Sequence, residues 1–471
     1  MPTTLLLSLP FTNDAITFGI LICILASIFY TASLDSPGWK RFYTFVPSLL
    51  LCYFIPAMFN YPLGIIAPHW YEGSAVFDFA RQLGVSITPD MEYFEINNAL
   101  KEVIGKDEVL KAQHEALQGH SSLYYVASRY LLPASLILFC LGIDFQGLLN
   151  LGWKAIVMFL AATVGIIIGG PIALMATSYI SPDIVGGNPD ELWRGLSTIA
   201  GSWIGGGANQ TAMKEIYEVS DNLFGTMIVV DVVVANIWMG FLLYGANFSD
   251  KIDAKLGADN SAISNLKDRI ADYRANVEEM PTVNKLFTLM AVAFGGVALA
   301  HLGSEVMVPI MKNNEDTLKS LNLTSLTSSF FWIVVISTTI GLSLSFTRAR
   351  RLEGVGASRW GSIFIYVLVA TIGMKMNLGE VFDNLGLFAI GIIWMLVHVI
   401  ILLLVAYIIK APFFYVAVGS QANIGGAASA PIVASAFNPS LAPVGVLMAV
   451  LGYALGTYGA IICAQLMSAV G

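Results

Sequence analysis

Two polar, glycine-rich stretches decide the organisation of this chain: GSWIGGGANQTA at 201–212 and GSQANIGGAASAP at 419–431. They resemble two copies of one motif. From Ile204 onward, the second copy follows the first at a constant offset of 220 residues, which pairs Ile204 with Ile424 and Gly206 with Gly426. Such a stretch is poor for helix and rich in backbone polar groups. Repeated once in each half of an apolar chain, it is typical of the substrate site of a transporter.

The rest of the chain is strongly apolar. Hydrophobic residues make up 56 % of it, charged residues only 12 %, and the mean hydropathy is +0.72. Soluble domains are less apolar and more charged, so we predict an all-α integral membrane protein. We further expect a multi-pass protein of the bacterial inner membrane, with the lipid bilayer as its partner. The net charge of -8 gives no support for a nucleic-acid partner.

Ten apolar stretches are long enough to cross a hydrocarbon layer of about 30 Å. They are residues 15–34, 43–66, 123–143, 155–180, 223–245, 286–311, 328–347, 360–376, 386–409 and 442–468. The glycine-rich stretches lie outside all ten. The four cysteines fall singly in separate stretches and the histidines lack metal-ligand spacing, so we expect no transition metal and no cofactor.

Two polar regions divide the chain. Residues 67–122 form an acidic insert, which we expect outside the cytoplasm, and residues 246–283 form a linker, which we expect inside it. A first repeat would then cover 1–245, with a discontinuous element at 195–220. A second repeat would cover 284–471, with a discontinuous element at 412–438.

The distribution of Lys and Arg bears on how these elements sit in the membrane. The excess expected on the cytoplasmic side favours about ten spans, with both glycine-rich elements turning back as re-entrant hairpins and both termini outside. The alternative has both elements crossing, which gives twelve spans and both termini inside. With hairpins, the two halves face opposite ways, as in the inverted repeats of secondary transporters.

The glycine-rich stretches supply the candidate site. Glycine lets the backbone leave helical geometry; free N–H groups at broken helix starts suit a carboxylate, whereas carbonyls at broken ends suit Na⁺. The predicted substrate-binding residues are Ser202, Gly205, Gly206, Asn209, Gln210, Thr211, Ser420, Gln421, Asn423, Gly425, Gly426 and Ser429. The alternative is an ordinary small-residue helix contact of the GxxxG kind.

Asp231 is a second signal, because it lies about 12 Å inside its apolar stretch. A lone carboxylate there costs about 2.5 to 3.5 kcal/mol, so it should face a cavity, a cation or a proton path. We predict coupling-ion roles for Asp231, Asn209, Asn423 and Thr457, with Na⁺ near Asp231. The alternative is a buried aspartate that is simply hydrogen-bonded to the hairpin backbone. The matched position in the second half is Leu451, so the repeat loses the charge there.

Four other ionisable groups receive structural interpretations. Lys375 ends an apolar stretch, where its ammonium group can reach the interface. His301 and Glu305 lie one helical turn apart and can pair. His398 is isolated in its stretch, so we expect it to be packed.

The twin motifs, the two-half plan and the flanking spans resemble a family of membrane proteins catalogued as domain of unknown function 819, YjcL-like. That family is similar in organisation to the sodium-coupled glutamate and citrate carriers and, more distantly, to the bile-acid carriers and cation/proton antiporters. The resemblance implies a scaffold domain, a mobile core domain with two discontinuous elements, a homodimer, and sodium or proton coupling to a small organic solute. The chain lacks the acidic pair and the core lysine of electrogenic antiporters at positions matching Asp231 and Leu451.

We therefore predict a secondary active transporter: a sodium-coupled symporter of a small anionic solute, such as an amino acid, a short peptide fragment or a carboxylate, working by alternating access. A proton-coupled transporter or a cation/proton antiporter is the first alternative. A passive channel, a non-transporting receptor and an intramembrane enzyme are more distant ones. Intramembrane aspartyl proteolysis needs two facing aspartates, and only one lies deep in a span, so we do not expect an enzyme.

Overall fold

The computed structural model describes residues 10–46, 48–71, 73–88, 91, 93–105, 107–143, 151–180, 189–258, 281–320, 323–376, 386–438 and 441–470. Among these residues, the regular structure is helical except for two short antiparallel strands, β1 (His69–Tyr71) and β2 (Gln118–His120). The predicted all-α fold is therefore confirmed.

Every predicted apolar stretch contains a helix. In the first half, these are α1 (Asp14–Ser33), α3 (Ser48–Asn60), the continuous run of α7 (Leu123–Val126), η1 (Ala127–Leu131) and α8 (Leu132–Leu141), α10 (Trp153–Ile180) and α14 (Asp221–Ala246). In the second half, they are α17 (Val283–Lys312), α19 (Ser329–Ser345), α20 (Ala357–Gly373), α21 (Gly386–Ile409) and α24 (Ala442–Ser468). The shorter helices α2 (Pro37–Phe45), α15 (Ser249–Leu256), α18 (Glu315–Ser320), η2 (Thr324–Thr327) and η3 (Arg348–Glu353) connect them.

Helix length separates these elements. Within the described residues, seven helices are long and apolar enough to cross a membrane, or up to eight if the bent pair of α2 and α3 forms one span. The helices α19 and α20 have 17 residues each, about 25 Å of helix, at the lower limit for a span. The chain is thus a multi-pass membrane protein, with fewer full-length helices than the ten predicted stretches.

The helices form two packed groups. In one, α8 packs against α17, α19 and α20, and α3 packs against α20. In the other, α10 packs against α21, and α24 lies between the two glycine-rich elements, in contact with both. The pair α10 and α21 come from corresponding places in the two halves. They approach closely because Gly169 of α10 leaves room for Trp394 of α21, whose indole N–H donates to the Ile166 carbonyl at 2.8 Å.

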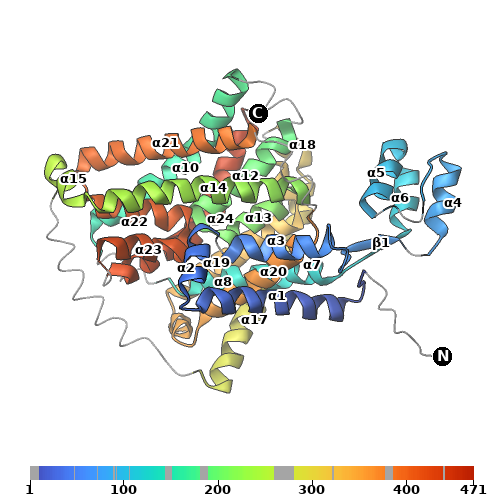
Figure 1. Cartoon of the computed structure of the whole chain (residues 1–471), viewed down its shortest axis with the longest axis horizontal. Helices are drawn as coiled ribbons and strands as arrows, with labels where there is room; N and C mark the ends of the chain where they lie inside the picture. The colour runs from blue at the N-terminus through green and yellow to red at the C-terminus, as the bar shows by residue number, and fades with distance from the viewer. Residues whose placement is uncertain are drawn as a thin grey trace.

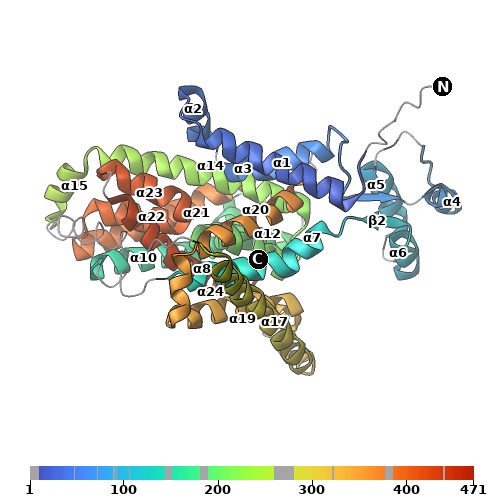
Figure 2. The same ribbon diagram turned by 90° about the horizontal axis from the view of Figure 1, so that it is seen from below.

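The insert at 67–122 folds as a small unit of its own. It contains β1, β2, α4 (Ala75–Gln82), α5 (Tyr93–Ile104) and α6 (Glu108–Glu115). It has a separate apolar core, made of Val76, Phe79, Ala80, Ile96, Leu100 and Ile104. Figures 1 and 2 show it projecting from one end of the molecule, while α15, the first helix of the predicted linker, lies at the opposite end. Residues 259–280 of that linker lie outside the described residues.

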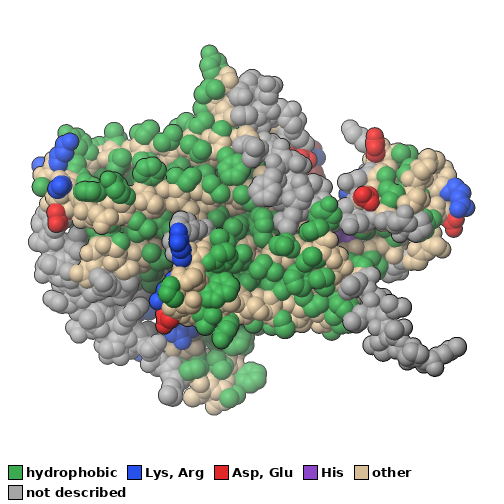
Figure 3. All heavy atoms as spheres, in the orientation of Figure 1, with side chains coloured by type: hydrophobic (Ala, Val, Ile, Leu, Met, Phe, Trp, Pro, Cys, Tyr) green, Lys and Arg blue, Asp and Glu red, His purple; other side chains and the backbone are tan. Residues whose placement is uncertain are grey.

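The surface follows the same axis. Figure 3 shows hydrophobic side chains spread over α1, α3, α14 and α21, while charged side chains lie on the insert, around α15 and near α2. Apolar atoms along the sides and charges at the ends are what a bilayer requires of the protein that it surrounds.

Candidate substrate and ion site

Each glycine-rich stretch contains the junction of two helices, which lies at a glycine. The first comprises α12 (Pro189–Gly205) and α13 (Gly207–Ile216), and the second α22 (Phe413–Ile424) and α23 (Gly426–Phe437). Gly206 has φ +78° and Gly426 has φ +55°. Both values lie in the left-handed region, which residues with a Cβ rarely adopt. The sequence repeat therefore marks the two breaks themselves.

Both elements bend sharply at the break. A Cβ atom on Gly201 of α12 would lie 2.6 Å from the carbonyl oxygen of Asn209 in α13. Eight residues span about 12 Å in a continuous helix, so α13 folds back along α12. In the second element, Gln421 Nε2 donates to Ser429 Oγ at 2.6 Å across the same separation.

Asp231 of α14 binds the first element directly. Its side chain is 6 % exposed. Oδ2 accepts hydrogen bonds from Ser202 Oγ at 2.6 Å and Gln210 Nε2 at 3.0 Å, and Oδ1 accepts one from Trp203 Nε1 at 2.7 Å. The carboxylate thus joins both helices of the element to α14. These partners are side chains, so the hydrogen-bonded alternative for Asp231 has a structural basis, with side chains in place of the expected backbone.

Asn209 and Asn423 make similar hydrogen bonds, although Asn209 lies after the break in its element and Asn423 lies before it. Asn209 Nδ2 donates to the Gly205 carbonyl at 3.0 Å, and its Oδ1 accepts from Thr457 Oγ1 of α24 at 2.6 Å. Asn423 Nδ2 donates to the Gly419 carbonyl at 3.0 Å, and its Oδ1 accepts from Thr163 Oγ1 of α10 at 2.8 Å. In each element, one asparagine therefore ties its own helix to a threonine on a long neighbouring helix.

The two elements meet at α24. A Cβ on Gly452 would lie 2.7 Å from the Ile204 carbonyl oxygen and 3.5 Å from the Ala422 carbonyl oxygen. A Cβ on Gly456 would lie 2.5 Å from the Gly205 Cα. Because these glycines have no side chain, the last turns of α12 and α22 can bring their carbonyl oxygens to one place. Carbonyl oxygen at such an unwound end is the kind of ligand that Na⁺ takes in transporters.

Ser420 holds the second element to α14 and α21. Its Oγ accepts from Trp238 Nε1 at 2.8 Å and lies 2.8 Å from His398 Nε2. The other ring nitrogen of His398, Nδ1, lies 3.1 Å from the Ala162 carbonyl oxygen, which can only accept, so Nδ1 carries a proton. His398 is buried, as predicted, and has a specific polar role that the sequence did not indicate.

One buried acceptor at the second break has no partner. Gln421 is 2 % exposed, and its Oε1 receives no hydrogen bond from the described residues. A buried carbonyl oxygen without a donor costs about 1–3 kcal/mol. This amide oxygen is therefore available to a cation or a ligand.

The structure brings the predicted residues together in two groups. Ser202, Gln210 and Asp231 form one with Trp203, and Asn209 and Thr457 adjoin it; Ser420, Gln421, Asn423 and Ser429 surround the second break. Thr211 does not join either group, because its hydroxyl donates to the Gly207 carbonyl of its own helix at 2.8 Å.

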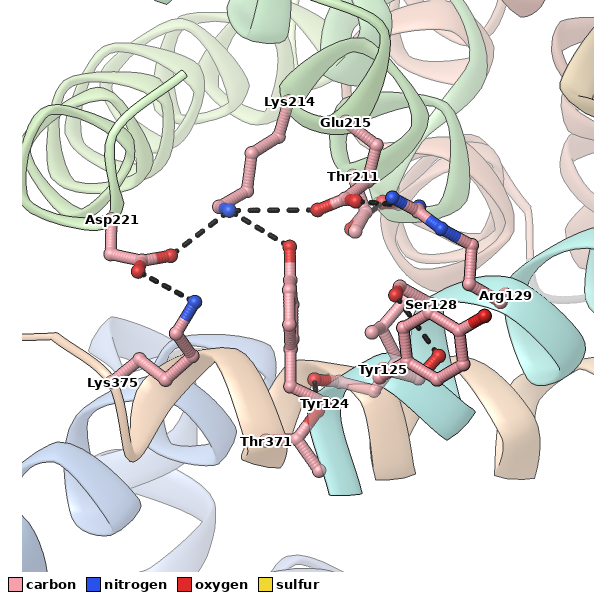
Figure 4. Close-up of polar contacts among 12 residues, drawn as sticks. Tyr124, Tyr125, Ser128, Arg129, Thr211, Lys214, Glu215, Asp221, Thr371 and Lys375 are labelled. Carbon is pink, nitrogen blue, oxygen red and sulfur yellow. Dashed lines mark hydrogen bonds and ion pairs between the residues drawn. The ribbon is translucent and has the colours of Figure 1, made fainter. Parts of the chain in front are cut away.

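A buried cluster of charges lies at the far end of α13, and sequence reasoning missed it (Figure 4). Lys214 Nζ lies 2.9 Å from Asp221 Oδ1 and 3.6 Å from Glu215 Oε1. Lys375 Nζ lies 2.9 Å from Asp221 Oδ2, and Arg129 Nη1 lies 2.9 Å from Glu215 Oε2. Lys214 also donates to the Tyr124 hydroxyl at 2.9 Å. Lys375 thus forms an ion pair, where we had interpreted it as reaching alone to the interface.

His301 also differs from its predicted pairing with Glu305. Its Nε2 lies 3.1 Å from the carbonyl oxygen of Arg129, and its ring stacks on Tyr130. The contact joins α17 to η1. The spacing of one helical turn within α17 suggested Glu305 as the partner of His301. The packing of η1 against α17 gives His301 a different partner.

Comparison with known sequences places the chain in a family. Residues 116–470 match the protein family of unknown function DUF819. The uncharacterized membrane protein YjcL of Bacillus subtilis (strain 168) is 22% identical over 356 residues, which cover 72% of this chain and 82% of YjcL. The family match includes both discontinuous elements and most of the helices described above. The chain therefore belongs to the DUF819 family.

Proposed function

We propose that this protein is a secondary active transporter, a sodium-coupled symporter of a small anionic organic solute such as an amino acid, a short peptide fragment or a carboxylate. The observation that carries the proposal is the meeting of two broken helices at one place on α24, beside a buried carboxylate. Broken helices are costly in a membrane unless they are buried in protein or line a water-filled cavity. Two of them, at equivalent places in the two halves, are the arrangement through which secondary transporters bind their solutes.

The broken helix starts provide the anion side of the site. The first N–H groups of α13 and α23 have no partner within their own helices, and they carry partial positive charge. A solute carboxylate at either break would receive these hydrogen bonds without needing a basic side chain.

The broken helix ends provide the cation side. The Ile204 and Ala422 carbonyls meet at Gly452, and Gln421 Oε1 lacks a donor. All three groups are oxygen ligands of the type that Na⁺ takes in transporters. Asp231 contributes a negative charge near the end of α12. It is hydrogen-bonded to Ser202 and Trp203, which directly precede Ile204 in α12.

The surroundings of Asp231 favour Na⁺ over H⁺ as the coupling ion. The indole and the amide nitrogens of Trp203 and Gln210 can only donate, and Ser202 donates as well. Such a set matches an ionised carboxylate. A protonated Asp231 would have to reverse its hydrogen bond with Ser202, whose hydroxyl can also accept, so a proton-coupled carrier remains the second candidate.

Alternating access would come from movement of one helix group against the other. The core group would be α10, α12–α14 and α21–α24, and the scaffold group α1, α3, α8, α17, α19 and α20. In this proposal, each discontinuous element is a re-entrant hairpin, the scaffold forms the contact of a homodimer, and the protein resides in a bacterial inner membrane.

A ligand screen tests the proposal on purified protein. Amino acids, dipeptides and carboxylates are added with Na⁺ or with choline, and the melting temperature is followed, because a ligand that binds only the folded state raises it. A carboxylate-bearing ligand that stabilises the protein only with Na⁺ supports the symporter. Stabilisation that follows pH and ignores Na⁺ would support the proton-coupled candidate instead.

A further inference from the structure

A second cavity lies away from the broken helices, between the insert and the start of α14. Its volume is about 580 Å³, within the range of about 300–1,000 Å³ typical of small-molecule sites. The insert contributes Lys101 and Lys111, and the membrane part contributes Asp221 and Lys375. The cavity is therefore lined by segments that are distant from one another in the sequence.

The wall on the insert side is held by a polar network. Tyr93 Oη donates to Gln118 Oε1 at 3.1 Å, and Gln118 Nε2 lies 3.1 Å from His114 Nε2. The Tyr71 hydroxyl lies 2.9 Å from the same His114 nitrogen, and the His69 ring stacks on Tyr93 at 5.6 Å. Side chains fixed in this way lose little further entropy when a ligand binds.

Cations exceed carboxylates in the lining. Lys101, Lys111 and Lys375 face Glu115 and Asp221. Asp221 forms ion pairs with Lys375 and Lys214, each at 2.9 Å, so the remaining balance of the lining is set by Lys101 and Lys111 against Glu115. The cavity therefore has a positive balance, which favours an anionic group.

His69 adds no charge to this balance. Burial and then the nearby Lys375 lower its pKa to about 4, so the imidazole is neutral at neutral pH. It can serve as a hydrogen-bonding group for a ligand beside the lysines.

We propose that this cavity binds a small solute that carries a carboxylate, with Lys101 and Lys111 of the insert as its partners. The site is separate from the broken helices, and the inference does not depend on the proposed transport. An ion pair nevertheless connects the cavity to the first discontinuous element. Asp221, which lines the cavity, pairs with Lys214 of α13. A bound solute would thus lie against the start of α14 and one ion pair away from α13, both of which belong to the core group of the proposed transporter.

Lysine footprinting tests the site on the unmodified full-length protein. The protein in detergent is acetylated with an amine-reactive reagent in the presence of succinate, glutarate or N-acetyl-L-glutamate, which carry carboxylates but no free amine, and the rate at each lysine is followed by mass spectrometry. Lys255 on α15 is exposed and distant, so it serves as the internal control. At least one probe should slow modification of Lys101 and Lys111 several-fold and saturably, with Lys255 unchanged. Unchanged rates at Lys101 and Lys111 with all three probes at millimolar concentration would overturn the proposal.

A double variant adds a second readout. Lys101→Gln with Lys111→Gln should lose the ligand-induced rise in melting temperature that originates in this cavity. Arg81→Gln should keep it, because Arg81 lies on the same insert but its side chain is 81% exposed and does not line the cavity. Equal shifts in both variants would contradict the assignment of the lysines.

The two proposals fail separately. Footprinting is an equilibrium measurement without a sodium gradient, whereas transport requires flux. Protection of the two lysines without any Na⁺-dependent uptake would keep this site and reject the symporter. Uptake without protection would do the reverse.

Discussion

Asp231 shows how a single residue can join a site to its support. Its carboxylate accepts three hydrogen bonds from the first discontinuous element while buried in α14. Hydrogen bonds to a charged group contribute about 1.5–3 kcal/mol each. Asp231 therefore ties both helices of the element to α14, and the matched position in the second half, Leu451, has no group that can do the same.

Replacing Asp231 by Asn should destabilise the protein by about 1–3 kcal/mol. The amide keeps the shape of the side chain but turns one acceptor into an N–H₂ group, which then faces donors. The measurement is the melting temperature of the purified variant. Asp250→Asn on the exposed helix α15 is the control and should melt like the wild type. Equal stability of Asp231→Asn and the wild type would show that the three hydrogen bonds are not formed.

Gly456 tests the close approach of α24 to the first break. A Cβ there would lie 2.5 Å from the Cα of Gly205, and backbone cannot move aside as a side chain can. Gly456→Ala should therefore cost about 1–3 kcal/mol through overpacking. Gly240→Ala on α14, where a Cβ meets nothing within 4 Å, should be neutral or slightly stabilising. Thermal unfolding of both variants compares them, and a stable Gly456→Ala would contradict the packing.

At the scale of elements, the stability of the insert depends on His69 being neutral. In the folded insert, burial and Lys375 hold the pKa of His69 at about 4, against 6.5 when unfolded. Between these values, the unfolded state binds a proton that the folded state does not. The contribution of His69 to stability is thus complete above pH 6.5 and is lost as the pH falls toward 4.

Hydrogen exchange of the insert measures this effect. Protection factors for residues 69–120, corrected for the intrinsic pH dependence of exchange, should fall as the pH is lowered from 6.5 to 4. His69→Gln should show a smaller fall, because it removes the titrating group while keeping polar atoms. A wild-type insert whose protection is the same at both pH values would contradict the neutral histidine.

The sequence predicted the elements better than their contacts. Glycine spacing and duplication predicted both breaks, because left-handed backbone has a direct residue preference at Gly206 and Gly426. The position of Asp231 deep within an apolar stretch predicted that its side chain is buried. The partners of these groups could not be predicted in the same way: Trp203 donates to Asp231 only because α12 packs beside α14.

The buried charge cluster illustrates the same limit. Its members lie on η1, α13, α14 and just after α20, so no spacing in the sequence links them. Lys375 looked like an interfacial lysine because only its own helix could be considered. Its pairing with Asp221 comes from the other half of the chain.

At the scale of the whole molecule, the account predicts opposite sides for the two ends. The insert and α15 lie at opposite ends of the long axis (Figure 1). In intact cells, a cysteine replacing Arg81 in a cysteine-free background should react with a membrane-impermeant maleimide. A cysteine replacing Lys255 should react only after permeabilisation. Labelling of both positions from outside would contradict the predicted placement of the insert and the linker.

The central claim is sodium-coupled transport through the two broken helices, and uptake into proteoliposomes tests it most directly. The probe is the radiolabelled carboxylate that raises the melting temperature only with Na⁺. The account predicts accumulation that requires an inward Na⁺ gradient and that is lost in Asp231→Asn and Asn209→Ala reconstituted to the same density. Uptake that is indifferent to Na⁺ and unchanged in both variants would contradict it.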